Sequence, residues 1–283
     1  MAIITISRGS FSHGKEIAEK VARKLGYACI SREILLEAAQ YFHVSERALL
    51  KSIHDAPSLL DRITHGRLKY IAYFRAALLD HVREDNVVYH GHAGHLLIPE
   101  VPHVFKARVI ADMAMRIAFL QEKKNMSREE ATAFLAEEDK QRAIWTRYLY
   151  KVDLEDPRLY NIILNIGGLT IDDACGIICG AVQSDTFKTT PESQRIIGDL
   201  AVVSHVKAAL QDICDADVSS TDGMVHIRVS AQKIRRTGYI SPKHQMNLKE
   251  NIKEDIQSEI IQIVKMVPGV REVFCDVETP YYA

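Results

Sequence analysis

The hydrophobic pattern at the start of the chain predicts a strand, a loop and a helix in succession. Residues 2–7 (AIITIS) form a short apolar run rich in β-branched side chains, which is typical of a buried strand. In residues 15–26 (KEIAEKVARKLG) apolar positions recur at helical spacing, and Gly26 lies where a glycine commonly ends a helix. The glycine-containing stretch between them is therefore expected to be a loop that leads from a strand into a helix.

The same two patterns alternate along the chain as far as about residue 183. Within the long charged stretch after residue 112, Ser127 and Glu130 have the spacing of a capping box, which predicts a helix start there. The strands are expected at 2–7, 86–92, 103–111 and 161–166, and the helices at 15–26, 32–42, 57–83, 113–150 and 169–182. Strands that alternate with helices predict an α/β fold with a mainly parallel sheet covered on both faces.

After residue 183 the pattern changes. Residues 184–197 are mostly polar, contain one proline and show no sustained apolar periodicity, so we interpret them as a linker. The rest of the chain predicts a small α+β domain, in which Asp222-Gly223 separates two strands and Pro268-Gly269 precedes a last strand. Two domains are thus expected, residues 1–183 and residues 198–283.

Composition narrows the class of protein. The 283 residues are 47% hydrophobic and 26% charged with a net charge of -1, so nucleic acid and anionic membranes are not expected as main partners. No apolar run approaches the roughly 18 residues that cross a bilayer, and no signal segment precedes the first strand. Five scattered cysteines argue against a disulfide framework. We therefore expect a cytoplasmic protein without a membrane span.

The loop after the first strand carries the strongest chemical signal. Its sequence, GSFSHGKE, has the glycines and the lysine of a phosphate-binding loop, with Glu16 in place of the Ser or Thr that normally holds Mg²⁺. A helix N-terminus attracts phosphate because its first N–H groups lack internal partners and its dipole is positive there. The alternative is a tight structural turn. The residues expected to bind the nucleotide are Gly9, Ser10, Phe11, Ser12, His13, Gly14, Lys15 and Glu16.

Residues 7–35 (SRGSFSHGKEIAEKVARKLGYACISREIL) resemble the start of the cytidylate kinase-like family, a branch of the P-loop nucleoside monophosphate kinases. The resemblance continues through residues 104–174, which match the family's strand, lid and final strand in order. It implies a P-loop NTPase-type parallel sheet with a helical lid, and ATP-dependent phosphoryl transfer with Mg²⁺ to a small nucleotide, CMP or dCMP. In this family the last loop position is often not Ser or Thr, so the resemblance implies that Glu16 is a family trait.

The resemblance also assigns residues outside the loop. It places Arg108 or Arg116 near the nucleotide, and Lys140 in the lid with its Asp-x-x-Arg signature. Cations on a closing lid suit phosphoryl transfer because they stabilise the transferring group and exclude water. The alternative is a solvated, charged helix pair. The expected catalytic residues are Lys15, Arg142 and Arg147, and the expected substrate-binding residues are Arg67, Arg75, His92, Arg116 and Asp139.

One stretch departs from the family pattern. Where the family tends to have Gly-Arg followed by Asp, this chain has HGHAGH, residues 90–95, with His92 at the arginine's place. A second hypothesis is therefore a nucleotide-binding regulatory protein that has lost transfer activity and signals through its C-terminal domain. The three histidines also suit a Zn²⁺ site, although no local carboxylate completes one. We favour contacts of these histidines with phosphate or a base, and we predict no metal site.

The C-terminal domain offers a weaker resemblance. A helix, the turn Val-Pro-Gly-Val and a strand near its end resemble the BON domain, a small αβ module of bacteria. Arg235, Arg236 and Lys243 lie in a basic loop, which we interpret as solvated rather than as an anion site. We expect this domain to serve regulation or homodimerisation.

Overall fold

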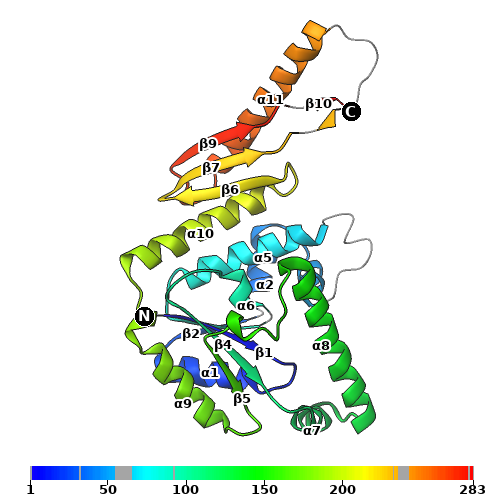
Figure 1. The fold of residues 1–283 in the computed structure, drawn as a ribbon, viewed down its shortest axis with the longest axis vertical. Coiled ribbons are helices and arrows are strands. Elements are labelled where there is room, and N and C mark those ends of the chain that lie inside the picture. The colour runs from blue at the N-terminus through cyan, green and yellow to red at the C-terminus, as the bar shows by residue number, and fades with distance from the viewer. Residues whose placement is uncertain are drawn as a thin grey trace. The chain divides into compact units, whose positions relative to one another are not determined.

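The computed structural model describes residues 2–31, 33–54, 66–91, 93–231, 233–234, 242–279 and 281–282. The chain divides into two compact units, Met1–Gln194 and Arg195–Ala283 (Figure 1). The division falls within the stretch predicted as a linker. Helix α10 (Pro191–Leu210) nevertheless begins inside that stretch, because Thr190 and Ser193 exchange backbone-to-side-chain hydrogen bonds of 2.9 and 3.1 Å at its start. The helix thus begins seven residues, about two turns, before the expected domain start at residue 198.

The first unit is built on a five-stranded sheet in the order β2-β3-β1-β4-β5, and every neighbouring pair is parallel. The strands are β1 (Ile3–Arg8), β2 (Ala28–Ile30), β3 (Val87–His90), β4 (Val104–Ile110) and β5 (Ile162–Asn165). This confirms the predicted parallel α/β sheet. Strand β2 was not expected, because three residues are too short for an alternating pattern to be recognised.

Helices flank this sheet (Figure 1). They are α1 (Gly14–Leu25), α2 (Glu33–Tyr41), α3 (Glu46–His54), α5 (Gly66–Val82), α6 (Gly94–Leu97), α7 (Met113–Lys124), α8 (Arg128–Tyr150) and α9 (Ile171–Val182). Of the predicted helix 57–83, residues 57–65 lie outside the described residues. Helices α1 and α9 pack side by side on one face of the sheet, where Cys175 and Cys179 are buried among aliphatic side chains.

Local signals fix the ends of several helices. Gly26 adopts a left-handed conformation (φ 71°) and its N–H bonds the carbonyl of Ala22, so it ends α1 as expected. Ser127 and Glu130 form the predicted capping box at the start of α8, with hydrogen bonds of 3.2 and 2.8 Å. The helical stretch predicted over residues 113–150 consists of two helices, because Asn125 (φ 52°) ends α7 in the left-handed conformation and α8 starts after the predicted cap at Ser127.

The second unit is a small α+β unit. Its sheet has the order β6-β7-β9, in which β6 (Ala216–Thr221) and β7 (Met224–Val229) are antiparallel and β9 (Glu272–Val277) is parallel to β7. Helix α10 and helix α11 (Pro242–Lys265) supply apolar side chains to the core on one face of the sheet. Two further short strands, β8 (Lys233–Ile234) and β10 (Tyr281–Tyr282), pair in parallel.

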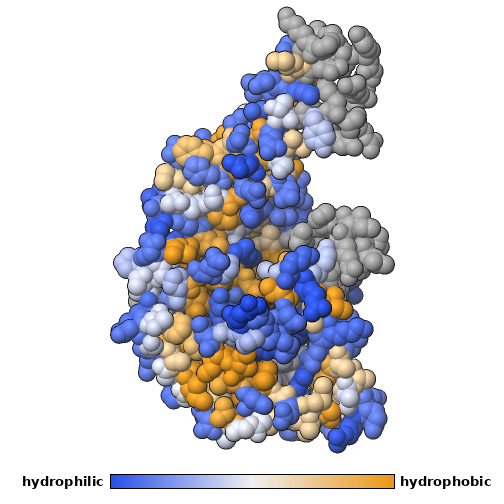
Figure 2. All heavy atoms as spheres, viewed as in Figure 1, coloured by the Kyte–Doolittle hydropathy of each residue, from blue (hydrophilic) through white to orange (hydrophobic). Residues whose placement is uncertain are grey.

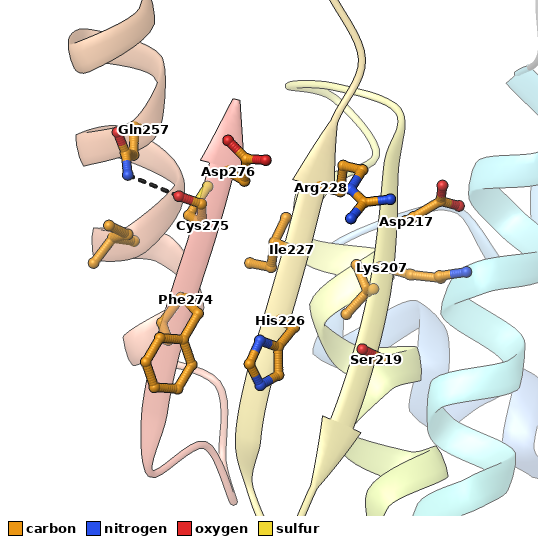
Figure 3. Close-up of a pocket in the computed structure, with 13 residues that line it drawn as sticks. Lys207, Asp217, Ser219, His226, Ile227, Arg228, Gln257, Phe274, Cys275 and Asp276 are labelled. Carbon is orange, nitrogen blue, oxygen red and sulfur yellow. Dashed lines mark hydrogen bonds between the residues drawn. The ribbon is translucent and has the colours of Figure 1, made fainter. Parts of the chain in front are cut away.

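Residues of all three strands, together with Lys207 of α10 and Gln257 of α11, line a cavity of about 660 Å³ (Figure 3). The rings of His226 and Phe274, which line it, stack 4.7 Å apart between centroids. Arg235 and Arg236 of the predicted basic loop lie outside the described residues, as does the side chain of Lys243. The resemblance to the BON domain stays a prediction.

The described helices include none that is long and apolar enough to cross a membrane. The face of the molecule shown in Figure 2 mixes hydrophilic and hydrophobic side chains.

Candidate active site

The predicted phosphate-binding loop lies between the carboxyl end of β1 and the start of α1. Phe11 and His13 adopt left-handed conformations, with φ of 60° and 58°, which few non-glycine residues adopt. Ser12 is fully buried, and its Oγ donates to the carbonyls of Gly9 (2.9 Å) and Val109 (3.1 Å). The loop is therefore a tightly folded turn fastened to β4, as well as the predicted entrance to a helix.

The two glycines of the loop have different roles. A Cβ atom on Gly14 would lie 2.7 Å from Cβ and 2.8 Å from Cδ of Arg8, which is closer than real Cβ contacts come. A Cβ on Gly9 would meet nothing closer than 3.8 Å. Gly14 is thus required by the packing of Arg8, and Gly9 is not required by its neighbours.

Several polar groups in the loop are available to bind an anion. No side chain caps the N-terminus of α1, so the first N–H groups of that helix have no side-chain acceptor. Ser10 is 2% exposed, and among the described residues its Oγ has no hydrogen-bond partner. The ammonium of Lys15 is well exposed and lies 3.5 Å from Glu19. The geometry suits a phosphate chain, whose oxygens are acceptors for all of these donors.

A cavity of about 1200 Å³ opens over the loop. Of the predicted site residues, Ser10, Phe11, His13, Lys15, Glu16 and Arg142 line it. Cationic side chains outnumber carboxylates in its lining. The cations are Arg8, Lys15, Arg47, Lys51, Lys123, Lys124 and Arg142, and the carboxylates are Glu16, Glu19 and Glu138.

Arg142 lies at this cavity, and Arg147 does not line it. Arg142 donates a 2.9 Å hydrogen bond to the carbonyl of Arg8, and burial lowers its pKa while Glu138 partly opposes that effect. Arg147 has an exposed side chain that pairs with Asp153 at 3.2 Å. Five residues on an α-helix correspond to a rotation of about 140° beyond a full turn, so the two side chains leave α8 in different directions.

Arg116 and Asp139 lie outside the cavity lining and connect three elements. Arg116, on α7, is 8% exposed. Its Nε donates to the carbonyl of Ser10 at 2.7 Å, and its two terminal nitrogens each donate to one carboxylate oxygen of Asp139 at 2.8 Å. The predicted pair of substrate-binding residues therefore links the loop to α7 and α8.

The remaining predicted substrate-binding residues divide into two groups. Arg75 does not line the cavity; its Nε donates to the carbonyl of Leu97 at 3.0 Å, and burial lowers its pKa. His92 and the side chain of Arg67 lie outside the described residues.

The HGHAGH stretch is shaped by a tyrosine that precedes it. A Cβ on Gly91 or on Gly94 would lie 2.4 Å from the side chain of Tyr89, so both glycines make room for this ring. Tyr89 is buried, and burial raises its pKa. His95 is also buried, which lowers its pKa to about 3 and keeps the imidazole neutral. In the part of the chain that the structure describes, no three His, Cys, Asp or Glu side chains are grouped to hold a metal ion.

Sequence analysis missed several residues of the cavity. Arg8 directly precedes the loop and lines the cavity. Its position at a strand end next to Gly9 is the sequence signal by which it could have been identified. Arg47 and Lys51 occupy neighbouring turns of α3, a helix that was not predicted. Phe119 and Phe134 line the cavity from α7 and α8, with ring centroids 6.2 and 5.9 Å from that of Phe11.

Comparison with known proteins gives one family match. The model of the cytidylate kinase-like family matches residues 3–167. None of the curated proteins matches. Among solved structures, an uncharacterized protein from Eubacterium ventriosum is similar, with 19% identity and a TM-score of 0.49 over 65% of this chain and 99% of that chain.

Two shikimate kinases are also similar. The enzyme from Bacteroides thetaiotaomicron has 14% identity and a TM-score of 0.41, over 65% of this chain and 99% of that chain. The enzyme from Acinetobacter baumannii, in complex with shikimate, has 12% identity and a TM-score of 0.38, over 66% of this chain and 96% of that chain.

Proposed function

The chain belongs to the cytidylate kinase-like family, and from this premise we propose that it transfers a phosphoryl group from ATP to a nucleoside monophosphate, CMP or dCMP. Membership of the family supports phosphoryl transfer of the P-loop kinase type, and the acceptor is the finer part of the proposal. The observation that carries it is the loop of residues 9–16, whose unpartnered donors and Lys15 face a cavity rich in cationic side chains.

The donor end of the cavity would hold the phosphates of ATP. The first N–H groups of α1 and the ammonium of Lys15 would bind the β and γ phosphates, as oriented amides and a point charge do in other phosphate loops. Arg142 keeps its guanidinium at the cavity by bonding the carbonyl of Arg8, so it needs little movement to reach a transferring group. Its role would be to stabilise the charge of that group and to exclude water.

A magnesium ion fits this arrangement. Mg²⁺ is usually held by phosphate oxygens, waters and one or two carboxylates, and Glu16 and Glu138 line the cavity. When bound, it would neutralise charge on the phosphates. The carboxylate of Glu16 is 3.2 Å from Nδ1 of His13, which orients it at the mouth of the loop.

The acceptor end would use residues other than those expected from the sequence. Arg47 and Lys51 lie four residues apart on α3, line the cavity and have no ion-pair partner within the described ranges. Their charges would attract an anionic acceptor. Leu35 and Phe74 line the same cavity and offer apolar surface to a ring. A nucleoside monophosphate combines a phosphate with a planar base, so it suits this pairing.

The test is ADP release coupled to a reporter enzyme, with CMP, dCMP, UMP, AMP and GMP offered separately. Lys15→Ala removes the loop's cation, and Lys20→Ala is its matched control because Lys20 lies on the same helix and pairs with Asp172 instead. We expect release that depends on one acceptor, is lost in Lys15→Ala and persists in Lys20→Ala. Release that persists in Lys15→Ala would contradict the assignment of the loop.

A second candidate is a nucleotide-binding regulatory protein that acts through its second unit. The HGHAGH stretch favours it, because His92 stands at the place where the family tends to have an arginine. This candidate predicts that ATP binds in a Lys15-dependent way while every acceptor fails, and that ATP changes association of the protein with itself or with a regulatory partner.

A further inference from the structure

We propose that Arg116, held by Asp139, is a positioning residue that fixes the phosphate-binding loop in its anion-binding shape before a nucleotide arrives. The proposal rests on the proposed function only in taking a polyphosphate as the ligand of the loop. It assigns to Arg116 and Asp139 a task other than contact with the substrate.

Each of the three nitrogens of the Arg116 guanidinium donates a hydrogen bond to the protein. One edge donates to Asp139 through two parallel bonds of 2.8 Å, and Nε donates to the carbonyl of Ser10 at 2.7 Å. Such a two-pronged bond fixes the plane of a guanidinium as well as its position. Asp139 also supplies the opposite charge for a cation that is 8% exposed. Asp139 thus holds Arg116 in the orientation that bonds the loop.

The bond to Ser10 determines where the next amide points. In a trans peptide the C=O and N–H groups lie on opposite sides of the chain. Because the Ser10 carbonyl is turned toward Arg116, the N–H of Phe11 is turned away from it. In the same way, the bond from Ser12 to the Gly9 carbonyl turns away the N–H of Ser10.

These two N–H groups donate to no backbone carbonyl of the described residues, and Ser10 and Phe11 both line the cavity. The bonds from Arg116 to Ser10 and from Ser12 to Gly9 therefore leave two oriented N–H donors for the phosphate chain.

The same two helices hold the side chain of Phe11. Its ring lies 6.2 Å from Phe119 on α7 and 5.9 Å from Phe134 on α8, between ring centroids. A left-handed conformation at a phenylalanine persists only where surrounding contacts impose it. Helices α7 and α8 thus hold the loop through the bond from Arg116 to the Ser10 carbonyl and through the side chain of Phe11. The two helices and the loop therefore form one packed unit.

The test uses Arg116→Ala, Arg116→Lys and Asp139→Asn, with Arg83→Ala as the control. Arg83 is also an arginine of this unit, but it pairs with Asp80 and Glu84 and does not line the cavity. Binding of ATP and of inorganic tripolyphosphate is measured by calorimetry. Tripolyphosphate has no base or ribose, so it isolates the contribution of the loop.

We expect Arg116→Ala to weaken ATP and tripolyphosphate by the same factor, about tenfold or more, since it removes a charge-assisted bond that orients the loop. Arg116→Lys should recover part of the loss, because one ammonium reaches Ser10 or Asp139 but does not reproduce the fork. Arg83→Ala should leave both affinities unchanged. Weaker binding of ATP alone would show that Arg116 contacts the base or ribose and would overturn the proposal, as would unchanged binding of both.

A second readout needs no ligand. Hydrogen exchange of the amides of residues 9–13 should be about tenfold faster in Arg116→Ala and in Asp139→Asn than in Arg83→Ala, because the bond from Arg116 to Ser10 limits local opening of the loop. Equal exchange rates in these variants would overturn the proposal. If Arg116→Ala does not fold, Asp139→Asn carries the same comparison. Failure of every acceptor in the kinase assay leaves this result untouched, so the two proposals fail separately.

Discussion

Substitution of Gly14 by alanine tests how the loop is built. The new Cβ would lie 2.7 Å from Cβ of Arg8, whereas ordinary contact begins at 3.4 Å. The near end of a side chain cannot rotate away, so the end of β1 or the start of α1 must move. Overpacking of this kind typically costs about 1–3 kcal/mol of unfolding free energy. The shift displaces the carbonyl of Arg8, to which Arg142 is bonded, and a misplacement of about 1 Å costs on the order of 100-fold in rate.

The assays are urea unfolding for stability, calorimetry for ATP affinity and ADP release for turnover. The matched control is Gly176→Ala on α9, where an added Cβ meets nothing within 4 Å. That variant should gain roughly 0.5–1 kcal/mol, the difference in helix propensity between Gly and Ala, with unchanged ATP affinity. If Gly14→Ala matched Gly176→Ala in stability and in ATP affinity, the contact with Arg8 would not constrain the loop and the reasoning would be refuted.

Three further predictions concern stability. Burial opposes ionisation of Asp85, but contacts with His103 (3.1 Å) and Thr189 (2.7 Å) outweigh it and lower its pKa below the usual 3.8. The ionised carboxylate therefore stabilises the folded protein above about pH 4, and this stabilisation is lost as pH falls through the pKa of the folded state. Asp85→Asn should accordingly reduce the fall in unfolding temperature at acid pH, measured by thermal unfolding over a pH series. Ser127→Ala removes the cap of α8 and should cost about 0.5–2 kcal/mol in urea unfolding, whereas Ser127→Asp should be nearly neutral. Arg75→Ala should cost about 1–3 kcal/mol of unfolding free energy, because a carbonyl of α6 loses its donor, while KM for the acceptor stays unchanged; a raised acceptor KM with unchanged stability would instead support the predicted substrate-binding role of Arg75.

The parts of the fold that are encoded locally were predictable from the sequence. Periodicity gave α1, and single residues gave its end at Gly26 and the start of α8 at Ser127. The parallel sheet followed from the alternation of strands and helices. Within residues 113–150 the start of the second helix was predicted, but Asn125 was not identified as the end of the first, because asparagine adopts the left-handed conformation often enough to end a helix without breaking the apolar pattern around it.

The site was predictable only where sequence neighbours build it. The loop of residues 9–16 is such a case, because one strand end and one helix start suffice to place its donors. The arginines were harder, since a charged side chain on a helix is assigned to a site by the direction in which it leaves the helix and by what packs there. Arg142 and Arg147 both lie on α8, and their side chains leave the helix in different directions, so that only Arg142 of the two lines the cavity. Arg47 and Lys51 line the cavity because of where α3 packs.

The most direct test of the proposed function is identification of the product. ATP labelled with ¹⁸O in its γ-phosphoryl group is incubated with each acceptor, and the mixture is analysed by mass spectrometry. The account predicts that one acceptor, CMP or dCMP, gains a labelled phosphoryl group with the wild type and with Lys20→Ala, and that none does with Lys15→Ala. Bound ATP that transfers no label to any acceptor, or that releases it only as inorganic phosphate, would contradict the account.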